Sequence, residues 1–175
     1  LFTPDGALRV AAVQQQGAAS TMDFMDIDPR SGQTSTIASL AVRGTTIVQF
    51  DRDGRRALVT VGSLVTPWSV SLIDLGRAAA GPGTVLGEGL RPSAAFLVDG
   101  RIAVAAGGEK GTSAPRNLRI FSSAGQLVSE APLAPGEAAS VCGEMFPGIL
   151  AVMVESGGGR ELALFEIGSA TFVRR

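Results

Sequence analysis

The sequence predicts an all-β fold made of about four copies of one four-stranded unit, and three observations predict it. A glycine that closes a polar turn recurs at positions 6, 54, 100 and 148, in steps of 48, 46 and 48 residues. An alternating segment that ends in a polar residue recurs at positions 28, 74, 122 and 166, in steps of 46, 48 and 44. Finally, short runs rich in Val, Ile, Leu, Phe and Thr alternate with period two, and no dozen residues follow a helical period.

Each unit divides into four short strands, and the second unit shows them in order. Residues 45–50 precede an Asp-Gly turn, residues 57–61 form an apolar run, residues 68–74 alternate, and residues 84–87 end the unit before the next begins at 91. The Asp-Gly and Pro-Gly pairs between first and second strands provide the positive φ angles that tight hairpins need. Four short antiparallel strands every 47 residues or so are the pattern of a β-propeller blade.

The second strand of each unit is almost continuously apolar, at residues 8–13, 58–61, 102–106 and 149–154. Such a pattern is typical of a strand that is covered on both faces by neighbouring sheets. We therefore expect residues 1–175 to form a single β-propeller, either small or partial, with blades at about 1–42, 43–90, 91–136 and 137–175. The first blade is expected to be incomplete, because only Leu1 and Phe2 precede its first turn.

The segment Phe-Met-Asp-Ile-Asp-Pro-Arg-Ser-Gly-Gln-Thr at residues 24–34, which follows a Pro-Asp-Gly turn and an apolar strand, resembles a known repeat. It is similar to the unit of the YVTN and lactonase-like propellers, with kin among quinoprotein-type repeats, and the resemblance covers all four units. Propellers of this group usually have six to eight blades. The resemblance therefore implies either a compact small propeller or part of a larger ring, with further blades on the same or another chain.

The composition excludes several chemistries within this chain. It has no His, no Tyr and one Cys. The chain therefore cannot form a Ser-His-Asp triad, a Cys-His pair or a metal site with a His ligand. One Cys allows neither an internal disulfide nor a CxxC site. We accordingly expect no cofactor, no metal and no catalytic residue, and leave the question of enzymatic activity open with a preference for none.

The charge and hydropathy of the chain bear on its partners. The chain has fifteen Lys and Arg residues and sixteen Asp and Glu residues, which gives a net charge of −1. This charge gives no electrostatic reason to expect a nucleic-acid partner. No apolar run approaches the roughly 20 residues of a membrane span. Only 18% of residues are charged, so we expect the chain to bury much of itself or to contact a protein partner. We expect a periplasmic or extracellular location and leave a cytoplasmic one open.

Candidate ligand-binding residues lie in the loops between second and third strands, expected at residues 14–21, 62–67, 107–116 and 156–160. The third loop is the longest and most polar, and its Glu109, Lys110 and Arg116 could bind an anionic or polar ligand or a partner. The alternative is a solvated loop with an internal ion pair. Its sequence does not match a phosphate-binding loop.

Other polar residues are further candidates for sites. Asp26 and Asp28 share one strand face and Asp23 lies on the other, so a local calcium site is not expected. Glu144, Glu155 and Glu161 could line a channel end near the fourth unit, although the sequence shows no pairing among them. For Cys142 we expect a buried, inert thiol in a first strand.

Three functions of different classes follow from these observations. The first, which we favour, is a non-catalytic propeller that binds a protein partner or forms part of a larger assembly. The second is an enzyme that resembles lactonases or quinoproteins, and the missing His argues against it within this chain. The third is carbohydrate or small-ligand binding at the channel mouth, which would ordinarily need more aromatic surface than Trp68 alone provides.

Overall fold

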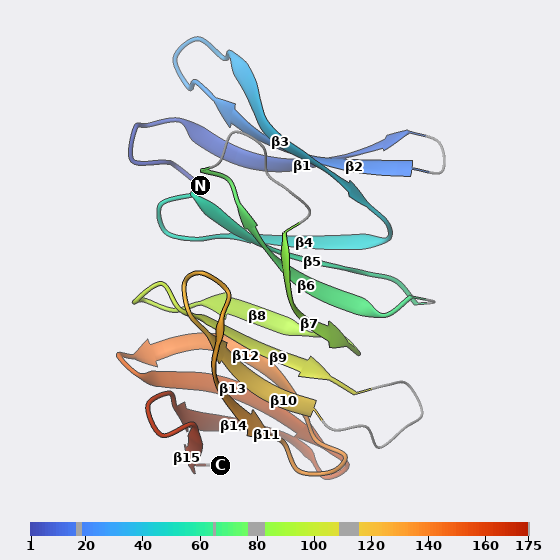
Figure 1. Ribbon diagram of the computed structural model, residues 1–175, viewed down its shortest axis with the longest axis vertical. Coiled ribbons are helices and arrows are strands. Elements are labelled where there is room, and N and C mark those ends of the chain that lie inside the picture. The colour runs from blue at the N-terminus through green and yellow to red at the C-terminus, as the bar shows by residue number, and fades with distance from the viewer. Residues whose placement is uncertain (17–18, 65, 77–82, 109–115, 175) are drawn as a thin grey trace. The chain divides into compact units, whose positions relative to one another are not determined.

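The described part of the chain is all β. The structure, a computed structural model, describes residues 1–175 except 17–18, 65, 77–82, 109–115 and 175 (Figure 1). Its described residues form fifteen strands and no helix. Accordingly, they contain no helix of the length and apolar character that crossing a membrane requires. This confirms the all-β class.

The strands fall into four sets, which we call the first to fourth blades. The first has β1 (Leu8–Gln16), β2 (Ala19–Ile27) and β3 (Thr34–Val42), and the second has β4 (Thr45–Phe50), β5 (Arg56–Gly62), β6 (Trp68–Asp74) and β7 (Thr84–Gly89). The third has β8 (Ser93–Phe96), β9 (Ile102–Gly107), β10 (Arg116–Phe121) and β11 (Leu127–Pro132), and the fourth has β12 (Ala138–Phe146), β13 (Ile149–Ser156), β14 (Gly159–Glu166) and β15 (Thr171–Arg174).

Within each blade consecutive strands are hydrogen-bonded neighbours, in the orders β1-β2-β3, β4-β5-β6-β7, β8-β9-β10-β11 and β12-β13-β14-β15. This up-and-down meander is the blade of a β-propeller. In addition, β7 pairs with β9 in parallel at one position, Gly89 with Gly107. The first blade has one strand fewer than the others; an isolated bridge between Phe2 and Leu8 occupies the corresponding position. The fold class predicted from the repeat, with its incomplete first blade, is therefore confirmed.

The chain divides into two compact units, and the division runs through the second blade. Unit 1 is Leu1–Thr66 with Ser71–Thr84, and unit 2 is Pro67–Val70 with Val85–Arg175. Each unit contains its own core. That residues 1–175 form a single domain, with the blade limits given above, stays a prediction.

The repeated glycines have the backbone conformation that the turns require. Gly6, Gly54, Gly100 and Gly148 have φ angles of 89°, 69°, 84° and 83°. In the first three turns, the glycine N–H donates to the carbonyl three residues earlier, at 2.9 to 3.1 Å. Because only glycine adopts these angles without a Cβ penalty, the turn explains why glycine recurs at this step.

We expect Gly148→Ala to lower the free energy of unfolding by about 1–2 kcal/mol. No heavy atom lies within 4 Å of a Cβ placed there, so the cost comes from the φ angle alone. Gly157→Ala is the matched control: it also has open space, but its φ is not positive. Urea denaturation of the two variants measures the difference, and equal stabilities would contradict the assignment of strain.

Unit 1 has a core between the first and second blades. Phe24 and Met22 on β2 are fully buried, and they pack with Ala57 and Val59 of β5. The rings of Phe24 and Phe50 meet edge to face, with centroids 6.0 Å apart. The alternation along β2 therefore places Met22 and Phe24 against the second blade.

Unit 2 has a larger core between the third and fourth blades. Leu118 and Ile120 of β10 are fully buried, as are Leu150 and Val152 of β13. Phe165 of β14 completes this core. We call the core-facing sides of β13 and β14 their inner faces.

Two local predictions were wrong. The loop expected at residues 14–21 is mostly strand, because β1 extends to Gln16 and β2 begins at Ala19. Cys142, expected to be buried, is exposed. It lies where the pairing of β12 with β13 shifts between Val141 and Gly143. Cys142 alternates with Ala139 and Val141, which pack on the unit 2 core, so its side chain lies on the other side of the strand. The expectation rested on the apolar character of a free thiol, which does not decide the side.

Candidate functional site

Of the three predicted ligand-binding residues, the structure describes only Arg116. Glu109 and Lys110 lie outside the described residues. Arg116 begins β10, where it pairs with Gly107 and is half-buried, and its carbonyl accepts the N–H of Leu133 at 2.9 Å. An anion-binding role for this loop therefore stays a prediction.

The three aspartates of the β2 region have separate partners. Asp26 forms an ion pair with Arg9, Asp23 accepts the Ser39 hydroxyl at 2.6 Å, and Asp28 lies beyond the strand, in the following turn. There the backbone N–H of Arg30 donates to Asp28, and this hydrogen bond is the main reason why the pKa of Asp28 is lowered. Among the described residues, no group of three or more His, Cys, Asp or Glu could hold a metal ion.

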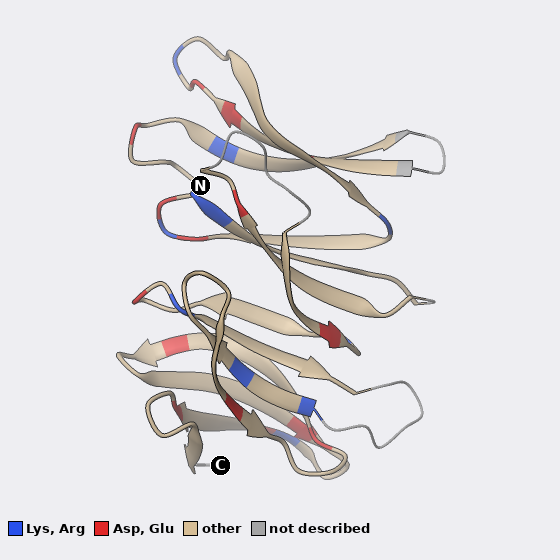
Figure 2. Cartoon of the chain, viewed as in Figure 1, with Lys and Arg blue, Asp and Glu red and all other residues tan. Residues whose placement is uncertain are grey.

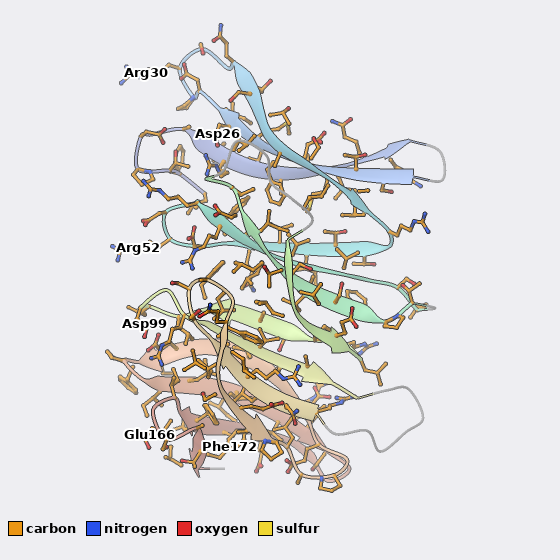
Figure 3. The ribbon with its side chains drawn as sticks, viewed as in Figure 1. Asp26, Arg30, Arg52, Asp99, Glu166 and Phe172 are labelled. Carbon is orange, nitrogen blue, oxygen red and sulfur yellow. The ribbon has the colours of Figure 1, made fainter. Side chains whose placement is uncertain are left out.

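A polar contact in unit 1 joins the turns of the first two blades. Arg9 donates to both carboxylate oxygens of Asp26, at 2.7 and 2.6 Å, and to the carbonyl of Gly54 at 2.5 Å. The bidentate pair is mostly buried; Figure 3 labels Asp26. Hydrogen bonds to Asp26 are also the main cause of the raised pKa of Arg9. This guanidinium links the strand pair β1-β2 to the Asp-Gly turn of the second blade.

Unit 2 has a comparable contact at Glu144. One carboxylate oxygen accepts the N–H of Val98, and the other accepts the N–H of Gly148, each at 2.7 Å. The two N–H groups belong to the first turns of the third and fourth blades. The sequence suggests Glu144 only as a residue at a channel end and does not reveal this role.

The repeat step could have revealed both contacts. Glu144 and Val98 are 46 residues apart, and Arg9 and Gly54 are 45 apart. A third such contact, from the Val141 N–H to the Ser93 hydroxyl, spans 48 residues. Polar side chains placed one repeat from a turn are therefore candidates for links between adjacent blades.

Burial differs between the second strands of the blades. In β5, Ala57, Leu58 and Val59 are at most 3% exposed, although successive side chains point to opposite faces. In β9 all residues from Ile102 to Ala106 are likewise buried. Both strands therefore match the predicted pattern of a strand covered on both sides.

The fourth blade is fully buried on its inner face but not on the opposite one, where Ala151 is buried and its apolar neighbours are not. Its opposite side, which we call its outer face, has apolar side chains that are partly or well exposed, namely those of Ile149, Met153, Leu162 and Leu164. Leu162 is 52% exposed and lies opposite Met153 in the strand pairing. The charged residues of this blade lie toward its turns and strand ends (Figure 2). The outer face therefore offers an apolar sheet surface.

The first blade is similar. Phe24 and Met22 face the unit 1 core, while Val10, Ala12 and Met25 point to the opposite side of the sheet and are only half-buried. The candidate functional surface of the chain thus consists of sheet faces on its first and fourth blades, each described within its own unit.

Comparison with known proteins supports the fold. The chain is similar to Kuenenia stuttgartiensis hydrazine synthase, with a TM-score of 0.56 and 13% identity over 94% of this chain and 52% of that one. It is also similar to the β-propeller domain of the trilobed protease from Pyrococcus furiosus (TM-score 0.43, 10% identity, 89% of this chain and 56% of that one). A third similar structure is the Penicillium chrysogenum α-L-arabinanase (0.45, 12%, 91% and 56%).

The chain spans about half the length of these solved chains. At such low identity the similarity concerns the fold alone. No protein-family model and no curated protein matches the sequence. The chain is thus a β-propeller protein by its blades, while its resemblance to the YVTN and lactonase-like group stays a prediction.

Proposed function

We propose that this chain is a protein-interaction module, a β-propeller segment that binds further β-structure or a partner protein through its end blades. The observation that carries the proposal is the contrast between β9 and β13. Both are second strands with apolar sequences, yet β9 is buried throughout, whereas Ile149 and Met153 of β13 stay partly exposed. A sheet that is apolar on both faces is stable in water only when both are covered.

Two further features support binding rather than catalysis. The polar side chains of Arg9 and Glu144, each with several hydrogen bonds, join adjacent blades. One similar solved chain, hydrazine synthase, is about twice as long as the region that this chain matches. Because this chain matches only about half of that protein, we infer that its four blades are completed by further blades or by a partner.

The proposal predicts self-association of the isolated chain. The outer face should find the same kind of apolar sheet on a second copy when its normal partner is absent, and Leu162→Glu should place an unpaired charge in that contact. We expect Leu162→Glu to weaken self-association by at least roughly tenfold, since a buried unpaired charge costs several kcal/mol. Sedimentation velocity over a concentration series measures the change.

Leu127→Glu is the matched control. Leu127 begins β11 in the same unit and is 53% exposed, so the substitution makes the same chemical change at almost the same exposure. We expect it to leave association unchanged. Equal association of the wild type and Leu162→Glu would refute a role for the outer face.

A further inference from the structure

The turns between first and second strands differ in chemistry between the two units. The residue directly before the recurring glycine is Asp5, Asp53, Asp99 and Pro147 in the four blades, and the residue before that is Pro4, Arg52, Val98 and Phe146. A tight turn needs glycine with polar residues or Pro and requires no large apolar side chain. The apolar residues Val98 and Phe146 in the turns of unit 2 therefore need another explanation.

Both of these side chains are well exposed. Val98 is 79% exposed, Phe146 is 63% exposed, and Pro147 beside it is exposed as well. We call Val98, Phe146 and Pro147 the turn patch. Contact with water is unfavourable for apolar side chains, and a group of them on a surface is typical of a site that another molecule covers.

One carboxylate joins the two turns of the turn patch. Glu144 accepts the N–H of Val98 at one oxygen and the N–H of Gly148 at the other, each at 2.7 Å. The N–H of Val141 also donates to the Ser93 hydroxyl at 2.8 Å, which connects the strands that precede the turns. Figure 1 shows both turns, β8 to β9 and β12 to β13, at the same end of unit 2. The turn patch is therefore one surface whose backbone is held in place.

The exposure of the turn patch does not depend on a missing neighbour. Val98 is exposed although the fourth blade follows the third in unit 2, and Pro4 is exposed although the second blade follows the first in unit 1. A blade that followed the fourth would thus leave the position of Phe146 exposed. Met145 is not counted in the turn patch, because its counterpart Leu97 is buried in the third blade.

The charges around the turn patch favour a protein over a lipid surface as its partner. In residues 97–101 and 144–148, all of which the structure describes, Arg101 is the one cation, and it forms an ion pair with Asp99 at 2.7 Å. The remaining charge is the carboxylate of Glu144. Anionic lipid headgroups attract Lys and Arg side chains, and these turns offer no unpaired cation. An apolar pocket of a protein receives an aromatic side chain without such a charge.

We propose that the turn patch is a docking site for a partner protein, and that the partner receives Phe146, with Val98 beside it, in an apolar pocket that carries no acidic side chain. An aromatic side chain that is buried at the centre of a contact contributes much of its binding energy. Because Glu144 already holds both turns, little conformational freedom is lost on binding. This inference rests on the proposed interaction function and adds a surface distinct from the outer face.

Photo-crosslinking from position 146 tests whether a partner protein covers the turn patch. In the cells that produce the full chain, p-benzoylphenylalanine replaces Phe146 in one variant and Phe2 in the other. Phe2 is the matched control, because it is the same side chain at 64% exposure in unit 1. We expect position 146 to give a crosslinked protein that position 2 does not give. No crosslinked protein, or a lipid or a second copy of this chain in its place, would overturn the proposal.

The affinity of the crosslinked protein for the purified full chain provides the second test. Phe146→Ala should weaken binding by at least roughly tenfold, and Val98→Thr by about threefold, whereas Phe2→Ala should leave binding unchanged. Phe146 is exposed, so its replacement should keep the fold, and urea denaturation checks this. Equal affinities of the wild type and Phe146→Ala would refute the role of the turn patch.

These outcomes separate the inference from the proposed role of the outer face. Leu162→Glu alters the outer face and should leave binding of the crosslinked protein intact, while Phe146→Ala should leave self-association intact. If Leu162→Glu abolishes self-association but Phe146→Ala still binds the partner, the turn patch is wrong and the outer face stands. If self-association is absent but Phe146→Ala loses the partner, the outer face is wrong and the turn patch stands.

Discussion

Phe165→Ala is expected to lower the free energy of unfolding of unit 2 by about 3–5 kcal/mol, because it removes a large side chain from a close-packed core. Phe165 is fully buried, and its ring packs edge-on against Phe172, with centroids 5.2 Å apart and an interplanar angle of 70°. Phe172 is labelled in Figure 3. The cavity left in the core adds to the lost hydrophobic burial.

Phe146→Ala is the control for this prediction. It deletes the same side chain at a position that is 63% exposed in the same unit, and we expect a change within about 0.5 kcal/mol. Urea denaturation can be followed by the fluorescence of Trp68, the one tryptophan of the chain, which belongs to unit 2. Similar losses in both variants would show that the core of unit 2 is placed wrongly.

Arg9→Met should destabilise unit 1 by roughly 2 kcal/mol. The variant keeps most of the side-chain volume but leaves the mostly buried carboxylate of Asp26 without its bidentate cation and the Gly54 carbonyl without a donor. The value lies below that of a fully buried pair because both side chains keep some contact with water. Native-state hydrogen exchange at Met22 and Phe24 would report the loss.

Arg30→Met is the matched comparison, since it removes an arginine in an exposed turn of the same unit (Figure 3). Its effect should stay within about 0.5 kcal/mol. If Arg9→Met is as mild as Arg30→Met, the link between the turns of the first two blades contributes little to stability.

The sequence predicts the repeat architecture well because the repeat is encoded in local chemistry. Gly54 and Gly100 recur since a hairpin turn needs a positive φ at that position, and β9 is apolar throughout since both of its faces are buried. Each of these requirements acts on one residue or one strand. Composition and period are therefore sufficient to detect them.

Predictions failed where a residue's position depends on its neighbours in space. Gln14 and Gln15 suggested a loop, yet their backbones pair with Thr21 and Ser20, and backbone pairing does not depend on the polarity of a side chain. Cys142 lies on the side of β12 opposite to Ala139 and Val141, which pack on the core, and the apolar character of a thiol does not reveal that side. The link from Glu144 to Val98 joins residues a full repeat apart, which local patterns do not show.

The central claim is that the outer face of the fourth blade needs a cover. Light scattering of the purified wild-type chain, from dilute to concentrated solution, tests it most directly. We expect an average mass that rises above the 17.8 kDa of one chain as concentration increases. A monodisperse mass of one chain throughout that range would contradict the claim.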